Sequence, residues 1–182
     1  MEIEKSSRHS KIIGAFGEAF LCNWLSRSGF EVTIIDHTGL DIIAYHRKSR
    51  CRLGITVKSR TRGRGKEAES VNVFFNRKRP GDRAKLRAAC NAFACEPWVA
   101  VYVETAGSAD LYLMSLKHYD QTYCQNKSRA VDTWKMGKKQ KRAYDLDKNV
   151  QHISVEFRET NWTFGGQGGS VLGQSRLTRR GT

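Results

Sequence analysis

Two short stretches joined by a polar turn constrain the fold more than any other feature of the chain. They read LDIIAYH (residues 40–46) and RLGITVK (residues 52–58), and both have the length and apolar content of β-strands. Side chains alternate between the two faces of a strand, so Thr56 and Lys58 point to the same side. The pattern predicts a β-hairpin that places Asp41 and Lys58 on adjacent strands.

The rest of the chain alternates between helical and strand patterns. Helices are expected at residues 11–28 and 82–94, and further strands at 30–36, 71–75, 98–104, 111–116 and 152–159. We expect a charged, glycine-bearing loop at 59–70, and the stretch 117–149 is polar and weakly patterned. This order of elements predicts an α/β fold built on one mixed sheet.

The first expected helix carries a glutamate beside its apolar stripe. The stripe consists of Ile13, Phe16, Phe20 and Trp24, which recur at steps of three to four residues. Glu18 lies about 140° from Ile13 around the helical wheel. Gly14 and Gly17 each cost roughly 1 kcal/mol relative to Ala inside a helix, and would let another backbone or a phosphate come close.

The charge of the chain favours a polyanionic partner. Its 182 residues suit one domain, which we place at 1–160, followed by a Gly-rich basic tail at 161–182. The formal net charge is +14, which favours nucleic acid, with an anionic membrane surface as the competing interpretation. No apolar run has the length of a membrane span, so we expect no membrane insertion.

The cysteines indicate a reducing compartment. There are five, an odd number, and none forms a C-x-x-C pair, so we expect free thiols and a cytoplasmic protein. The five histidines are scattered without the spacing of zinc ligands. The N-terminal MEIEKSSRHSK is polar, and we expect no secretory signal.

The order of three short motifs resembles the PD-(D/E)xK nuclease superfamily. These are Gly17-Glu18 on a helix, Gly39-Leu40-Asp41 on a strand and Val57-Lys58-Ser59-Arg60 on the next strand. The chain looks most like the Holliday-junction-resolvase branch and its restriction-enzyme relatives, over roughly residues 11 to 116. The resemblance implies a restriction-endonuclease-like fold, a central mixed β-sheet flanked by helices. It also implies a DNA endonuclease that hydrolyses phosphodiester bonds with Mg²⁺ or Mn²⁺.

The same resemblance implies a role for each of three residues. Asp41 would bind the metal, and Glu18 would complete the metal site. Lys58 would position or activate the attacking water and stabilise developing charge. The chemistry suits these residue types, because a hard cation needs oxygen ligands and a phosphoryl transition state gains negative charge.

The chain departs from the family at Thr56, where relatives carry an acid or Gln two residues before the lysine. The acid could have moved to Glu67, Glu69 or Asp82. Alternatively, Glu18 and Asp41 could suffice with more water ligands, or the site could be inactive. The last case gives the alternative function, a nuclease-derived nucleic-acid-binding module that no longer cuts.

Basic residues follow the expected catalytic strand and precede the second helix. We expect nucleic-acid contacts from Arg60, Arg62, Arg64, Lys66, Arg77, Lys78 and Arg79. A further basic cluster lies beside Trp134 and Tyr144, a composition that suits base stacking, while a core position for Trp134 is an equal alternative. DNA is the expected partner, although charge alone does not separate DNA from RNA. By analogy with small nucleases, a homodimer is a further expectation.

Overall fold

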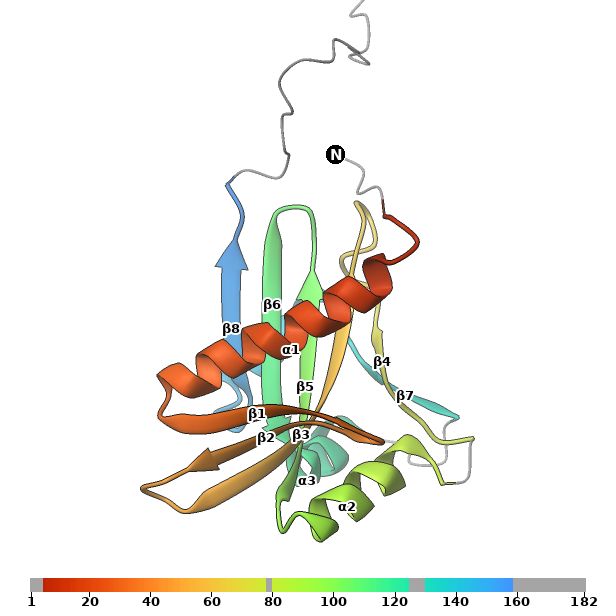
Figure 1. The fold of residues 1–182 in the computed structure, drawn as a ribbon. Coiled ribbons are helices and arrows are strands. Elements are labelled where there is room, and N and C mark those ends of the chain that lie inside the picture. The colour runs from red at the N-terminus through yellow and green to blue at the C-terminus, as the bar shows by residue number, and fades with distance from the viewer. Residues whose placement is uncertain (1–4, 78–79, 125–129, 159–182) are drawn as a thin grey trace, which may run out of the picture.

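The computed structural model describes residues 5–77, 80–124 and 130–158. In chain order the elements are α1 (His9–Arg27), β1 (Phe30–His37), β2 (Leu40–His46), β3 (Cys51–Thr61), β4 (Val71–Phe75), α2 (Asp82–Ala92), β5 (Glu96–Glu104), β6 (Ser108–Ser115), α3 (Leu116–His118), the π-helical segment η1 (Tyr119–Tyr123), β7 (Val131–Trp134), α4 (Lys138–Leu146) and β8 (Gln151–Glu156) (Figure 1).

Six strands form the central sheet in the order β1-β2-β3-β5-β6-β8. β3 and β5 are parallel, with Val57 beside Ala100, and the other neighbours are antiparallel. β4 and β7 form a separate antiparallel pair. The predicted architecture, a mixed sheet flanked by helices, is therefore confirmed.

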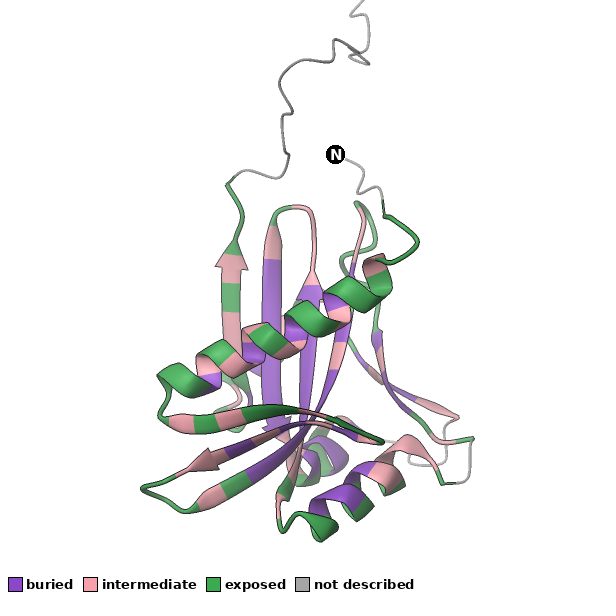
Figure 2. Ribbon diagram, viewed as in Figure 1, coloured by how far each residue is buried: buried purple, intermediate pink, exposed green. Residues whose placement is uncertain are grey.

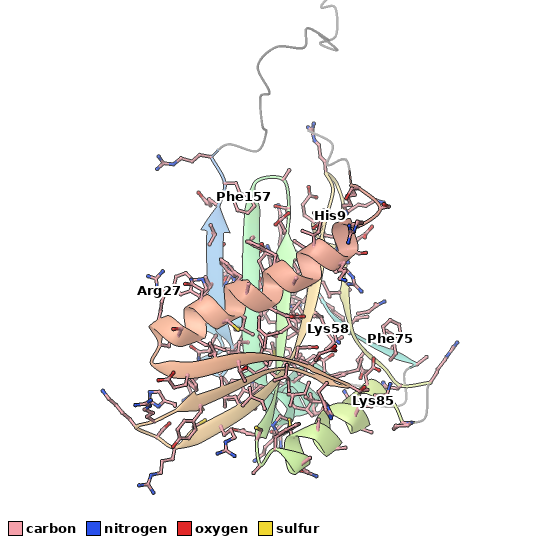
Figure 3. The ribbon with its side chains drawn as sticks, viewed as in Figure 1. His9, Arg27, Lys58, Phe75, Lys85 and Phe157 are labelled. Atoms are coloured by element: carbon pink, nitrogen blue, oxygen red, sulfur yellow. The ribbon has the colours of Figure 1, made fainter. Side chains whose placement is uncertain are left out.

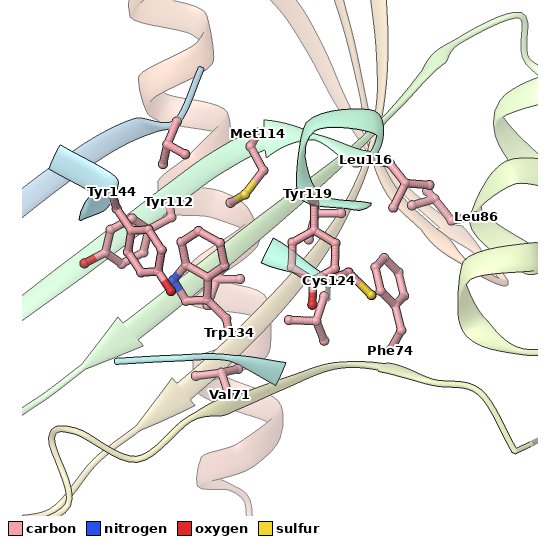
Figure 4. Packing of buried hydrophobic residues seen from close by; sticks show 14 of the residues in the cluster. Val71, Phe74, Leu86, Tyr112, Met114, Leu116, Tyr119, Cys124, Trp134 and Tyr144 are labelled. Carbon is pink, nitrogen blue, oxygen red and sulfur yellow. The ribbon is translucent and has the colours of Figure 1, made fainter. Parts of the chain in front are cut away.

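Each face of the sheet has its own hydrophobic core. α1 crosses one face and buries Ile13, Leu21 and Leu25 against residues such as Ile55 and Tyr102 (Figures 1 and 2). The other face is covered by α2, the β4–β7 pair and α4, whose core side chains are shown in Figure 4. The two cores hold β3 and β5 at the centre of the molecule, buried from both sides.

Trp134 and Tyr144 belong to this second core and are not available for base stacking. Their rings stack with centroids 3.8 Å apart, and Trp134 is fully buried. Of the two alternatives for Trp134, base stacking and a core position, the structure therefore supports the core position. Apolar burial outweighed the basic residues around them in the sequence.

The buried stripe of α1 is turned by about one residue from the expected one. Ile13, Gly17, Leu21 and Leu25 are buried at successive steps of four residues. Phe16 is 47% exposed and lies at the flank, where its ring packs on Tyr102. The apolar pattern predicted the wrong face because Gly17 has no side chain and so interrupts an apolar stripe. In the structure Gly17 is buried and lies directly against Ser59 of β3.

Two other stretches differ from the expectation. β3 runs to Thr61, so Arg60 belongs to the strand and not to a loop. The weakly patterned stretch after β6 contains α3, η1, β7 and α4. α4 is short and polar, and its position depends on tertiary contacts that periodicity does not reveal.

One buried carboxylate anchors α4 to the sheet. Asp110 on β6 accepts bonds from Lys141 on α4 (2.6 Å) and from His152 on β8 (3.0 Å). Burial alone would raise the pKa of Asp110, but these bonds lower it to about 2. The ionised form therefore persists at neutral pH and joins three elements.

The proposed tail at 161–182 lies outside the described residues, and the domain boundary before it stays a prediction. In the part of the chain that the structure describes, no helix has both the length and the apolar character needed to cross a membrane.

Candidate active site

A tight turn against α2 fixes the start of β2. Gly39 has a φ of +91°, which a side chain would strain. A Cβ at this position would also lie 2.8 Å from the backbone carbonyl carbon of Lys85. Glycine therefore allows both the turn and the close approach of α2, and Asp41 follows two residues later.

The Asp41 carboxylate bonds to β3 where regular pairing between β2 and β3 ends. The antiparallel ladder runs from the turn as far as Ile42 and Ile55. Beyond it, Asp41 Oδ2 accepts a hydrogen bond from the Val57 backbone N–H at 2.6 Å and one from Thr56 Oγ1 at 3.0 Å. Among the described residues no hydrogen bond reaches Oδ1, which is left for a ligand.

Glu18 enters the site from α1, directly after the closest helix–sheet contact. A Cβ on Gly17 would lie 2.2 Å from Ser59 Oγ and 3.2 Å from the Cβ of Tyr102. Only glycine lets α1 lie this close to β3 and β5. Position 18 then falls on the flank of α1 opposite Phe16, and its side chain is partly buried.

The pKa of Glu18 shows that three predicted residues share one electrostatic environment. Burial raises this pKa most, the Asp41 carboxylate raises it further, and Lys58 lowers it. Lys58 projects from β3 and is partly exposed (Figure 3). The structure therefore brings Glu18, Asp41 and Lys58 together.

Thr56 holds Asp41 in place. Its side chain is buried, with 3% of its surface exposed, and its hydroxyl donates to Asp41. A neutral hydroxyl already used as a donor is a poor substitute for an anionic metal ligand. The structure gives Thr56 an orienting contact at the position where the nuclease motif that the sequence resembles has an acid.

The three acids considered as replacements are occupied elsewhere. Glu69 pairs with Arg62, Glu67 accepts from the Gly65 N–H, and Asp82 accepts from the Phe75 N–H. Within residues 5–77, 80–124 and 130–158, no group of three or more His, Cys, Asp or Glu side chains is arranged to hold a metal. The arrangement does not support a migrated acid.

The donor set fits a magnesium ion that keeps several water ligands. Mg²⁺ is commonly held by one or two carboxylates together with water and substrate phosphate. Glu18 and Asp41 supply two hard oxygen ligands, and their mutual repulsion is what a cation would relieve. Cys22 adds no soft ligand, because burial and then Glu18 raise the pKa of its thiol.

The basic residues predicted to bind nucleic acid differ in their availability. Arg60, Arg64, Lys66 and Arg77 are exposed. Arg62 instead braces its own loop through Glu69 and the Ser70 carbonyl. Lys78 and Arg79 lie outside the described residues.

The basic cluster in the sequence that begins at Arg77 extends to Arg87, and two of its arginines are structural. Arg83 pairs with Asp120 and Asp132 inside the molecule, and Arg87 pairs with Asp120. Their charges are already compensated, so they are poor candidates for phosphate contacts.

The sequence did not reveal the contact between Gly17 and Ser59. Ser59 is buried, and its hydroxyl has no hydrogen-bond partner among the residues that the structure describes. The available signal was a glycine inside a helix, directly before the candidate glutamate. Gly17 lowers the stability of the helix, but it allows α1 to pack against Ser59.

The comparisons with known proteins find a likeness among solved structures only at low sequence identity. No family model matches the sequence, and no curated protein matches it. The chain is similar to the solved structure of Hjc, a Holliday junction resolvase from the archaeal hyperthermophile Archaeoglobus fulgidus. The two are 17% identical, the match covers 67% of this chain and 83% of the other, and the TM-score is 0.47.

Replacing Gly17 by Ala should destabilise the protein, although Ala is the better helix former. The added methyl group overlaps Ser59 Oγ, and overpacking of this kind costs about 1–3 kcal/mol. Ser59→Ala in the same chain should recover part of the loss, because it removes the nearest atom. Urea unfolding of the single and double variants measures both effects.

Gly14→Ala is the matched control in the same helix. A Cβ there meets nothing within 4 Å, so the variant should gain up to about 1 kcal/mol. Equal stabilities for the Gly14 and Gly17 variants would show that α1 does not depend on this contact.

Proposed function

We propose that this protein is a metal-dependent nuclease that hydrolyses phosphodiester bonds in DNA. The observation that supports this most is the meeting of Glu18, Asp41 and Lys58 where β2 separates from β3. Two acids and a lysine at one partly exposed point supply ligands for a hard cation and a positive charge for a phosphate.

Each residue has a distinct role in this proposal. Glu18 and Asp41 Oδ1 would hold the Mg²⁺ ion. When bound, the ion would polarise the phosphate and lower the pKa of a water molecule. Lys58 would orient that water and stabilise charge on the phosphate oxygens. Thr56 and the Val57 N–H would keep Asp41 oriented through Oδ2.

The absence of a third carboxylate has a consequence for metal affinity. A site with two anionic ligands leaves more coordination positions to water and binds a divalent cation more weakly than one with three. We therefore expect activity only at higher Mg²⁺ concentrations than a three-carboxylate site needs. Mn²⁺ should substitute for Mg²⁺, since it accepts the same oxygen ligands.

DNA is the proposed substrate because the chain is strongly basic and several exposed cations follow Lys58 in sequence. Arg60, Arg64 and Lys66 lie on or just after the strand that carries Lys58. Phosphate contacts supply most sequence-independent affinity for DNA.

Plasmid nicking tests the proposed activity. Supercoiled DNA with Mg²⁺ or Mn²⁺ should be nicked by the wild-type protein, and Lys58→Ala should lower the rate roughly 100-fold or more. Lys117→Ala, which removes an exposed lysine of α3, is the control and should cut at the wild-type rate. Failure of the wild-type protein to nick DNA with either metal, while still binding it, would favour the module that only binds.

Replacing Thr56 by Glu tests the metal site without relying on activity. In the absence of metal the variant should lose about 1–3 kcal/mol, because it loses the bond to Asp41 and gains a buried like charge. Mg²⁺ should restore this stability, since a third carboxylate raises metal affinity, and binding to the folded state stabilises it. Thermal unfolding across a magnesium series measures the shift.

The wild-type protein should show a smaller shift over the same series, and nicking by the Glu variant should need less magnesium. A Glu variant that stays folded yet gains no more stability from Mg²⁺ than the wild-type protein would contradict a metal site at Asp41.

A further inference from the structure

The N-terminal segment is fastened to the end of the strand that carries Lys58. Lys5 Nζ donates to the Thr61 carbonyl at 2.7 Å, and His9 Nε2 lies 2.8 Å from Thr61 Oγ1. Thr61 is buried at the end of β3. Figure 3 shows His9 in the first turn of α1. Two distant parts of the chain therefore form one surface.

This surface gathers exposed cations from two parts of the chain. The N-terminal basic arm, defined as Lys5, Arg8 and Lys11, is exposed. Among the described residues, neither the arm nor the β3 group, defined as Arg60, Arg64 and Lys66, forms an ion pair. Near the β3 group, Glu69 pairs with Arg62, and Glu67 accepts from the Gly65 N–H. Glu2 and Glu4, which precede the arm in sequence, lie outside the described residues.

Several basic residues elsewhere are instead paired with carboxylates. Arg83 and Arg87 pair with Asp120, Lys141 with Asp110, and Lys85 with Asp82. The first turn of α1 contains no acidic residue, so the partial positive charge of the helix end adds to that of the arm. Like charges kept together without counter-ions inside the protein favour an external polyanion.

We propose that the N-terminal basic arm and the β3 group form one phosphate-binding surface for duplex DNA that continues from the active site. Thr61 lies three residues beyond Lys58 on β3, or about 10 Å along an extended strand. This distance equals the rise of about three base pairs of duplex DNA. A duplex whose scissile phosphate lies at Lys58 would therefore pass over the arm within a few base pairs.

The inference rests on the proposed function, but its test does not need cleavage. Binding of a short fluorescent duplex is measured without divalent metal, across a series of salt concentrations, for the wild-type protein and for Lys5→Gln/Arg8→Gln/Lys11→Gln. Each lost phosphate contact should lower the log-log salt slope by about 0.9, so the triple variant should lose up to about 2.7.

A matched triple variant on α4 removes the same charge from another surface. Lys138, Lys139 and Arg142 are exposed, and α4 packs on the face of the sheet opposite α1. Replacing these three by Gln should leave the salt slope nearly unchanged. Equal loss from both triple variants would overturn the proposal, because net charge alone would then explain binding.

Two further probes decide the class of ligand. Tighter binding of a single strand of the same length than of the duplex would overturn the assignment to duplex DNA. Binding to phosphatidylglycerol vesicles, through the arm and without DNA binding, would overturn it in favour of a membrane surface. If DNA binding depends on the arm but plasmid is never nicked, the proposed DNA-binding surface is supported and the proposed nuclease activity is contradicted.

Discussion

The candidate site depends on one carboxylate that is bonded to the edge of a strand. Asp41 Oδ2 accepts from the Val57 N–H and the Thr56 hydroxyl just past the last regular pair of β2 and β3. The carboxylate thereby takes the backbone N–H of Val57, which regular pairing between β2 and β3 no longer reaches. Asp41 is thereby held where its carboxylate and the Lys58 ammonium both act on Glu18.

Two glycines let α1 and α2 pack closely beside Glu18 and Asp41. Gly39 allows the turn before Asp41 to lie against the backbone of α2, and Gly17 allows α1 to lie against Ser59. The site is therefore assembled by close packing on both faces of the sheet. Burial at this junction also raises the pKa of Glu18, next to the Asp41 carboxylate. A bound cation would offset the two causes that raise the pKa of Glu18, which are its burial and the Asp41 charge.

Strand alternation and motif order were enough to predict the hairpin, the mixed sheet and the grouping of Glu18 with Asp41 and Lys58. They did not predict the buried face of α1, because Gly17 carries no hydrophobic signal and its role comes from a contact with Ser59. They also missed α4, which is held by the ion pair of Lys141 with Asp110. Such contacts join residues far apart in the chain, and no local pattern encodes them.

The central claim is that Glu18 and Asp41 hold a divalent cation without a third acid. Crystals soaked in Mn²⁺ and measured at the manganese absorption edge test it directly, since anomalous scattering locates the ion. We expect one peak within coordination distance of a Glu18 carboxylate oxygen and of Asp41 Oδ1, absent in Asp41→Asn crystals. Saturating Mn²⁺ with no peak at this position, or a peak held by other residues, would contradict the claim.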